Sequence, residues 1–235
     1  MIVTSQTNTK LSVADIVESR NITEVVHFTS NFGLVGCLNS GNLLSRRQLP
    51  QEQTLKHVLE QTSPVIFEDQ DWFDKKKDWV DYVNMSLSEI NSSYFRFANE
   101  KWHPTGDRYW IIMSFDPKIL THDDVHFSTT NNVYDMTVRT PGADGLEALF
   151  APTVRRKSSS PNWVARRSAS TPSSLTTCEQ AEVLYPRAVS MEYLRTVYVQ
   201  CDDHADWAKM VLNRYKRQGV PIIAGPAKFQ GRPSR

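Results

Sequence analysis

The chain has 235 residues, with 27 Lys and Arg against 26 Asp and Glu, and 40% of its residues are hydrophobic. This composition is ordinary for a globular protein and excludes collagen-like, coiled-coil and wholly disordered chains. No apolar run approaches the ~18–20 residues of a membrane-spanning helix, and the N-terminus lacks the features of a secretory signal. We therefore expect a cytoplasmic protein with no membrane partner, and the three scattered cysteines agree with a reducing compartment.

The net charge of +1 hides an uneven distribution along the chain. Residues 1–150 contain 13 Lys and Arg against 20 Asp and Glu, which gives a net charge of −7. Residues 151–235 contain 14 Lys and Arg against 6 Asp and Glu, which gives +8. Such asymmetry indicates a polyanionic partner that contacts the C-terminal third of the chain.

The first 150 residues alternate short apolar segments with turn residues. Clustered β-branched and aromatic residues predict a strand at Ile22–Phe28, and the spacing of leucine and valine predicts a helix at Phe32–Asn39 that ends at Gly41. The other elements predicted here are a short helix at Val13–Ser19 within a polar lead-in (1–20), an amphipathic helix at Gln51–Gln61, a strand at Val83–Leu87, a helix at Ser88–Ala98 and a buried strand at Tyr109–Phe115.

Residues 151–178 differ in composition, since they hold five basic residues, three prolines, many Ser and Thr, and no acid. The segment has no hydrophobic period with which to pack, so we expect a long, partly mobile loop, and loops of this length are usually functional. The elements predicted after it are strands at Glu182–Leu184 and Arg195–Val199, a helix at Asp203–Gln218 with Asp203 as N-cap and Trp207, Met210, Val211 and Tyr215 facing inward, and a loose basic tail at 224–235.

Short strands mixed with helices, without a regular βαβ repeat, predict an α+β fold, and we expect one domain over residues 1–235. The sequence contains no GxGxxG, GxxxxGK[ST], HExxH or GxSxG motif, so several common classes of nucleotide-binding protein and hydrolase are excluded. The nearest approach to a metal site is His122 with His126. Their spacing needs a helix where the sequence predicts loop and strand, so we expect no metal.

Three short segments carry the candidate chemistry. His27-Phe28-Thr29 ends the first strand, Val83-Asn84-Met85-Ser86 lies in another, and Gln180-Ala181-Glu182 follows the basic loop. Each alone is compatible with a structural role. Together with the run Leu34–Ser45 they resemble the ADP-ribosyltransferases, and most closely the DarT family of DNA ADP-ribosyltransferase toxins, whose pattern reads H-[FI]-T, L-x-x-I-L-x-x-G-x-L and Q-A-E-[FV]-L. The resemblance covers residues 22–200, and QAE-x-L is its most specific element.

The resemblance implies an ADP-ribosyltransferase-like fold, with a central split or two-sheet β core flanked by helices, and NAD⁺ as the substrate. Glu182 and His27 would be the catalytic residues, with the Glu182 carboxylate stabilising the oxocarbenium-like centre that forms as nicotinamide leaves. The residues that would hold NAD⁺ are His27, Thr29 and Ser86, with Tyr94 or Phe95 as an aromatic face for nicotinamide. For the basic contact to NAD⁺ the candidates are Arg46, Arg47, Lys75, Lys76 and Lys77, although the triple lysine equally suits a solvated helix face.

The resemblance also makes residues 151–178 the substrate-recognition loop. Basic and hydroxyl side chains bind phosphates, and a tryptophan stacks on an unpaired base with about 1–3 kcal/mol, so we expect single-stranded DNA as substrate. The residues that would bind it are Arg155, Arg156, Lys157, Trp163, Arg166 and Arg167. A solubilising linker remains the alternative interpretation of this segment.

The target base follows from a departure from the family pattern. The thymine-directed branch carries an R-R-N run, which is absent from this chain, and Asp81–Leu87 (DYVNMSL) resembles the guanine-directed branch. The sequence therefore favours guanine over thymine. A toxin of this kind implies an antitoxin partner that neutralises it or removes the ADP-ribose. Two other functions stay open, namely an ADP-ribosyltransferase acting on RNA or protein, and a catalytically inactive nucleic-acid-binding module.

Overall fold

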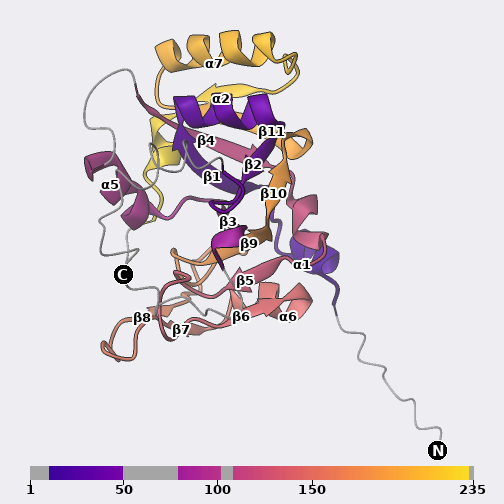
Figure 1. The fold of residues 1–235 in the computed structure, drawn as a ribbon. Helices are drawn as coiled ribbons and strands as arrows, with labels where there is room; N and C mark the ends of the chain where they lie inside the picture. The colour runs from indigo at the N-terminus through magenta and orange to yellow at the C-terminus, as the bar shows by residue number, and fades with distance from the viewer. Residues whose placement is uncertain (1–10, 50–78, 102–107, 233–235) are drawn as a thin grey trace, which may run out of the picture.

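The structure is a computed structural model, and it describes residues 11–49, 79–101 and 108–232 (Figure 1). The predicted helix at Gln51–Gln61 and the candidate Lys76, with its neighbouring lysines, lie outside these ranges. The α-helices of the described residues are α1 (Val13–Ser19), α2 (Asn31–Ser40), α5 (Ser92–Lys101), α6 (Gly142–Ala148) and α7 (Asp202–Arg214). The strands are β1 (Val25–Ser30), β2 (Asn42–Leu44), β3 (Tyr82–Leu87), β4 (Trp110–Phe115), β5 (His126–Ser128), β6 (Arg139–Pro141), β7 (Thr153–Arg155), β8 (Val164–Arg166), β9 (Glu182–Pro186), β10 (Ala188–Ser190), β11 (Leu194–Val199) and β12 (Ile222–Ala224).

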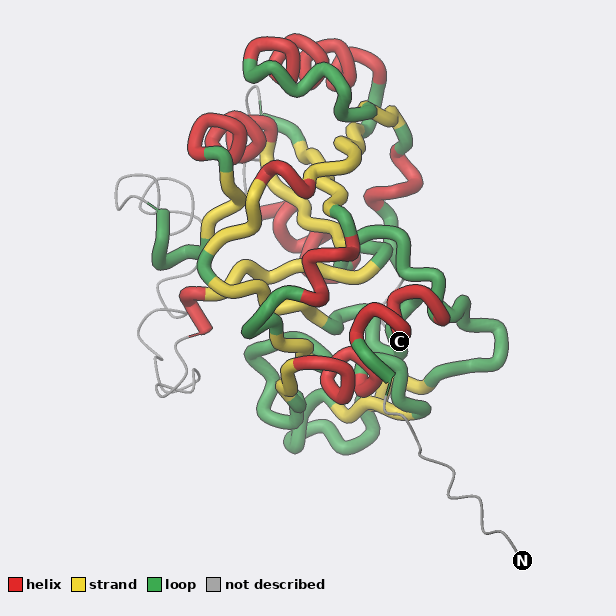
Figure 2. Tube along the Cα trace, turned by 90° about the vertical axis from the view of Figure 1, so that its right-hand side faces the viewer, coloured by secondary structure: helices red, strands yellow, loops and turns green. Residues whose placement is uncertain are grey.

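Eight strands form the central sheet, in the order β12-β11-β4-β1-β3-β9-β5-β6. Strand β1 pairs with β4 along its whole length, but with β3 only at Val25↔Leu87 and Val26↔Ser86. Beyond these pairs β3 continues with β9. The sheet is thus split between β1 and β3, which confirms the α+β class with a split β core. Helices α2 and α7 lie toward the β11 side and α6 lies beside β5 and β6, with the strands in the middle of the molecule (Figures 1 and 2).

Two apolar clusters cover opposite faces of the sheet, because successive residues of a strand point to opposite sides. The larger one includes Val25, Met85 and Met113. The smaller one includes Val26 and Ile112, and it is covered by α5 and by a short 3₁₀ turn at Pro226–Phe229. All six residues of β4 are buried, so the predicted strand with two buried faces is confirmed. No helix in the described ranges is long and apolar enough to cross a bilayer.

Local capping explains where the helices begin and end. Ser30 caps α2 by accepting from the amide of Gly33, and Gly41 ends the helix with φ of 71°, as predicted. The prediction for the last helix is partly wrong. Cys201, not Asp203, occupies the N-cap of α7, and Met210 is 61% exposed because it lies on the solvent face rather than the core face.

Two segments predicted to be loose are packed. Strands β7 and β8 form a hairpin whose Val154 and Ala165 are buried against Cys178, so the segment at 151–178 is more ordered than its composition indicates. The tail predicted at 224–235 also makes contacts, because Phe229 is buried and Arg232 donates to the carbonyl oxygen of Thr176 at 2.8 Å. Both segments therefore make contacts that their composition alone does not indicate.

The start of α2 has room only for glycine at position 33. A Cβ there would overlap Oγ1 of Thr29 and lie 3.2 and 3.3 Å from its Cβ and Cγ2, so a rotation of Thr29 would not relieve the contact. At Gly36 of the same helix a Cβ meets no atom within 4 Å.

We expect Gly33→Ala to lower the free energy of unfolding by about 1–3 kcal/mol through overpacking. Gly36→Ala, the matched control, should raise it by about 0.5–1 kcal/mol through helix propensity. Urea unfolding followed by circular dichroism measures both. Equal effects of the two substitutions would contradict the close packing of Thr29 against α2.

Candidate active site

The imidazole of His27 lies where strands β1 and β3 separate. Its Nδ1 is 2.9 Å from the carbonyl oxygen of Asn84, which lies two residues beyond Ser86, the last β3 residue of the β1–β3 pairing. A carbonyl oxygen only accepts, so Nδ1 carries the proton and Nε2 of the neutral ring is an acceptor. Burial lowers the pKa of His27, opposed by the bond to Asn84, which favours this neutral form.

Glu182 is the first residue of β9 and is half-buried. Its Oε2 accepts from Nδ2 of Asn84 at 3.0 Å and from the backbone N–H of Asn132 at 3.1 Å. Burial raises the pKa of the Glu182 carboxyl to about 7, although the two hydrogen bonds and the guanidinium groups of Arg46 and Arg139 lower it. Asn84 therefore connects the two predicted catalytic residues, with its carbonyl on His27 and its side chain on Glu182.

Strand register explains this arrangement. Asn84 pairs with Leu184 and Met85 with Val183, so Glu182 lies just past the end of the β3–β9 pairing. Ser86 pairs with Val26 and faces the same side of β3 as Asn84, because strand side chains alternate. Thr29 lies further along β1, where its side chain packs against the start of α2. The structure thus places His27, Ser86 and Glu182 around the split, with Thr29 at its α2 side.

Tyr94 of α5 and Arg46 complete the polar surroundings of the carboxylate. The Tyr94 side chain hydrogen-bonds Arg46, and its ring centroid is 5.8 Å from that of Phe28. Burial raises the pKa of Tyr94, with opposing contributions from Arg46 and a further raising one from Glu182. Arg46 is exposed and follows Ser45, which is buried and donates to Asp81 at 2.9 Å. The structure therefore brings Arg46 to Glu182.

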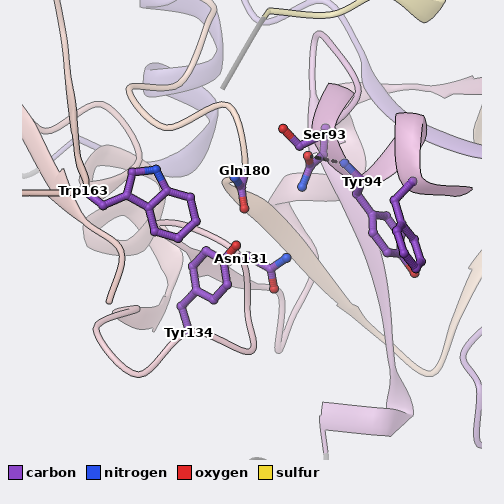
Figure 3. A pocket seen from close by; sticks show the side chains of 8 residues that line it. Ser93, Tyr94, Asn131, Tyr134, Trp163 and Gln180 are labelled. Carbon is purple, nitrogen blue, oxygen red and sulfur yellow. Dashed lines mark hydrogen bonds between the residues drawn. The ribbon is translucent and has the colours of Figure 1, made fainter. Parts of the chain in front are cut away.

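A cavity of about 370 Å³ lies beside these residues. Trp163 and Tyr134 lie on one side of it and Tyr94 on the other, with Gln180 and Asn131 between them (Figure 3). The rings of Trp163 and Tyr134 are 5.4 Å apart and tilted by 50°. Since Gln180 precedes Glu182 by two positions, and Asn131 directly precedes Asn132, the cavity opens next to the carboxylate. Its aromatic walls and amide groups suit a planar, hydrogen-bonding ring.

Sequence reasoning placed Asn84 in a candidate segment without giving it a role, and it missed Asn132 and Arg139. Asn84 was visible only as a polar residue in an alternating strand, and Asn132 lies in a loop with no pattern. Arg139 of β6 fixes that loop, because its guanidinium donates to the side-chain and backbone oxygens of Asn132. No motif or spacing in the sequence marks Asn132 or Arg139.

The basic residues of the predicted recognition loop divide into two groups. Arg155 and Arg166 are exposed on the β7–β8 hairpin, and the Lys157 ammonium lies 4.7 Å from the ring centroid of Tyr134. Arg156, in contrast, has no exposed surface, and its Nη2 is 2.8 Å from Oε2 of Glu179. Its prediction as a DNA-binding residue is corrected, because a fully buried guanidinium that is paired with a carboxylate cannot reach a phosphate.

Arg167 anchors the same segment. Its guanidinium donates to the carbonyl oxygen of Leu175 at 2.6 Å and to that of Pro172 at 2.8 Å. A third, longer contact joins Nη2 to the carbonyl oxygen of Ser173 at 3.5 Å. These contacts hold the segment before Thr176, so Arg167 has a structural role besides any contact to DNA. Within the part of the chain that the structure describes, no cluster of three His, Cys, Asp or Glu side chains suits a metal ion.

A split α+β sheet, with a histidine on one side of the split and a hydrogen-bonded glutamate on the other, is the arrangement expected of an ADP-ribosyltransferase fold. The family described as "ssDNA thymidine ADP-ribosyltransferase, DarT" matches residues 26–229, which is most of the chain. The chain therefore belongs to the DarT family of DNA ADP-ribosyltransferases. A search of curated protein sequences finds no match.

Several solved structures are similar in fold. Thermus sp. 2.9 DarT in complex with carba-NAD⁺ has a TM-score of 0.59 and 14% identity, over 88% of this chain and 97% of that one. The same protein in complex with ADP-ribosylated ssDNA has a TM-score of 0.57 and 14% identity, over 88% and 96%. Thermosipho africanus DarTG in complex with ADP-ribose has a TM-score of 0.59 and 14% identity, over 91% of this chain. The present chain spans about half, 52%, of that protein.

The buried pair of Arg156 and Glu179 allows a stability test. We expect Arg156→Met to lower the free energy of unfolding by about 3–5 kcal/mol, because it leaves the Glu179 carboxylate buried without its partner. Arg155→Met, at the neighbouring exposed position, should change it by no more than about 0.5 kcal/mol. Chemical denaturation measures both, and a tolerated Arg156→Met would show that the pair is not buried as described.

Proposed function

We propose that this protein is a toxin that transfers ADP-ribose from NAD⁺ to a base of single-stranded DNA. The observation that carries the proposal is the Glu182 carboxylate, which two hydrogen bonds hold beside the split of the sheet and next to an aromatic cavity. A fixed carboxylate in a partly dry site stabilises developing positive charge better than water does. The substrate pair is supported by membership of the DarT family and by two similar structures, which are complexes with NAD⁺ and with ADP-ribosylated ssDNA.

The reaction exchanges one glycosidic bond for another. The bond between C1′ of the ribose and the nicotinamide nitrogen breaks, and its electron pair stays on that nitrogen, which neutralises the pyridinium. A nitrogen of the DNA base then attacks C1′, and the base loses one proton, which passes to the Glu182 carboxylate or to water. The same carboxylate stabilises the oxocarbenium-like transition state. Its pKa of about 7 suits both roles near neutral pH.

The split between β1 and β3 supplies the groups for NAD⁺. Because Nδ1 of His27 donates to Asn84, Nε2 carries no proton and can accept a hydrogen bond from a ribose hydroxyl. Thr29 and Ser86 add hydroxyls, and the Tyr94 ring offers a face for nicotinamide. Arg46 supplies a guanidinium for the diphosphate, where paired donors fit phosphate oxygens. Lys76 remains a predicted contact.

The aromatic cavity and the hairpin suit the acceptor strand. An unpaired base that stacks on Trp163 or Tyr134 would point its edge toward Gln180 and the carboxylate. A base in a duplex must first be unpaired and unstacked, so a base of a single strand enters the cavity at a lower cost in free energy. Arg155, Arg166 and Lys157 on the exposed side of the hairpin would bind the phosphates.

The proposal also names a target base, guanine, and a partner, an antitoxin. Guanine is favoured by the absence of the R-R-N run and by the DYVNMSL segment, although the family description names thymidine. We also propose an antitoxin partner that removes ADP-ribose, as the resemblance to the toxin family implies, and action in the cytoplasm. One similar structure is named DarTG and holds ADP-ribose, which agrees with a partner of this chemistry.

The direct test incubates the protein with labelled NAD⁺ and one acceptor per reaction. The acceptors are single-stranded DNA, duplex DNA, RNA and protein. We expect label on single-stranded DNA, and on dG-containing rather than dT-only oligonucleotides. Glu182→Gln should reduce transfer at least about 100-fold while oligonucleotide binding persists. The control Glu192→Gln, in the turn before β11, should transfer normally.

Three outcomes would change the proposal. Labelling of dT-only strands would replace guanine by thymine, and labelling of RNA or protein alone would replace the acceptor. Intact NAD⁺ with every acceptor would leave only a nucleic-acid-binding module.

A further inference from the structure

We call residues Pro226–Arg232 the C-terminal strap. The strap covers the face of the sheet that carries the smaller apolar cluster, and Arg232 lies beside the first residue of α5. Phe229 is only 4% exposed, and its ring centroid lies 5.7 Å from that of Phe95 on α5. The same cluster includes Val26 and Trp110, so the strap closes the smaller apolar core. The strap is therefore attached to the helix that carries Tyr94, a wall of the cavity (Figures 1 and 3).

Lys228 of the strap holds the turn that precedes α5. Its ammonium pairs with the Glu24 carboxylate and donates to the carbonyl oxygen of Ser88 at 3.0 Å. Ser88 has φ of 61°, a left-handed conformation that costs a non-glycine residue free energy and persists only when its surroundings hold it. The ammonium and the backbone bond from Ser88 N–H to Glu24 at 3.2 Å provide that support.

Arg232 connects the start of α5 with the segment that precedes β9. Its Nε pairs with Glu89, and its backbone oxygen accepts from the Ser92 hydroxyl, so one side of Arg232 holds the start of α5. Its Nη2 donates to the carbonyl oxygen of Thr176 at 2.8 Å, in the segment that leads to Gln180 and Glu182. Arg167 of the hairpin takes the preceding carbonyl, that of Leu175. Two arginines thus hold consecutive carbonyl oxygens just before the catalytic strand.

Gly231 makes this close approach possible. Its φ is 56°, and a Cβ there would lie 2.9 Å from the carbonyl oxygen of Ile90 and 3.0 Å from Cβ of Ser92. The backbone of the strap therefore lies directly on the residues that begin α5. Arg232 itself lies beyond residues 26–229, the range that matches the DarT family.

We propose that Arg232 is a positioning residue that sets the spacing between the Tyr94 and Gln180 sides of the cavity, and through it the affinity for the DNA strand. This inference rests on the proposed function, since it assigns the cavity to DNA. Glu89 fixes one end of the link and the carbonyl oxygen of Thr176 the other. The Ser88 hydroxyl also donates to the carbonyl oxygen of Ser174 at 3.2 Å, so loss of the guanidinium loosens the connection between the two sides without removing it. A small misplacement of binding groups is enough to weaken a complex markedly.

The test compares Arg232→Gln, Arg232→Lys and the control Arg195→Gln in the full chain. Arg195 makes a similar surface ion pair with Asp116, at the β4–β11 end of the sheet. We measure the KM for an oligonucleotide, the KM for NAD⁺, kcat, and the Kd of a fluorescently labelled oligonucleotide. For Arg232→Gln we expect the DNA KM and Kd to rise about 10-fold, with kcat and the NAD⁺ KM changed less than about twofold.

Arg232→Lys should fall between the wild type and Arg232→Gln, because one ammonium cannot serve Glu89 and Thr176 with the geometry of a guanidinium. Arg195→Gln should resemble the wild type. If Arg232→Gln fails to fold at the assay temperature, Glu89→Gln breaks the same link from the other side and should raise the same two constants. Unchanged DNA affinity in a folded Arg232→Gln or Glu89→Gln, or an equal loss of NAD⁺ affinity, would overturn the inference.

The Kd arm separates this inference from the proposed function. If the wild type binds the oligonucleotide but transfers no label, the proposed reaction fails, whereas a 10-fold rise of Kd in Arg232→Gln still supports the positioning role. If the wild type does not bind the oligonucleotide, both proposals are wrong.

Discussion

The separation of β1 from β3 after only two residue pairs is the constraint on which the site depends. Beyond that point, the backbone groups on the facing edges of β1 and β3 no longer pair with each other. They must find other hydrogen-bond partners, because buried backbone polar groups are rarely left unpaired. The imidazole of His27 donates a hydrogen bond to one of these groups, the carbonyl oxygen of Asn84. The side-chain amide of Asn84 donates in turn to the Glu182 carboxylate. The split in the sheet is therefore bordered by three hydrogen-bonded residues, His27 of β1, Asn84 of β3 and Glu182 of β9.

This arrangement holds Glu182 at some cost to its charged form. Burial disfavours the carboxylate, and two hydrogen bonds with two nearby guanidinium groups compensate only in part, since the pKa stays at about 7. Shifts of this size with named partners are typical of functional sites. The clamp of Arg139 on Asn132 shows that the second hydrogen bond is itself held in place. The supporting groups come from the interior strand β3, the edge strand β6 and the loop that contains Asn132, and the strand that carries Glu182 begins beside the cavity.

Local sequence patterns predicted much of the fold and part of the site. The continuous apolar run of β4 and the glycine that ends α2 are set by short-range chemistry, and both predictions are confirmed. His27 and Glu182 were found because their tripeptides follow a family pattern, and the structure brings them to opposite sides of one asparagine.

The remaining features depend on contacts between residues far apart in sequence. Composition marks Arg155 and Arg156 alike, but only the pairing of β7 with β8 decides that one faces solvent and the other Glu179. Glycine, proline and basic residues give no periodic signal, so the sequence predicts a loose segment where the strap lies. Its order comes from partners such as Glu89 and Thr176, which are 143 and 56 positions away from Arg232.

The pH dependence of DNA labelling tests most directly whether the carboxylate held by Asn84 is the reaction centre. Burial raises the pKa of Glu182 to about 7, so the protonated form dominates below that pH and the reactive carboxylate above it. We predict that kcat/KM for NAD⁺ rises with pH through about 7. In Asn84→Ala this rise should move to higher pH, because the lost hydrogen bond had lowered the pKa. A rate that is flat between about pH 6 and 8, or a rise that stays in place in Asn84→Ala, would contradict this account.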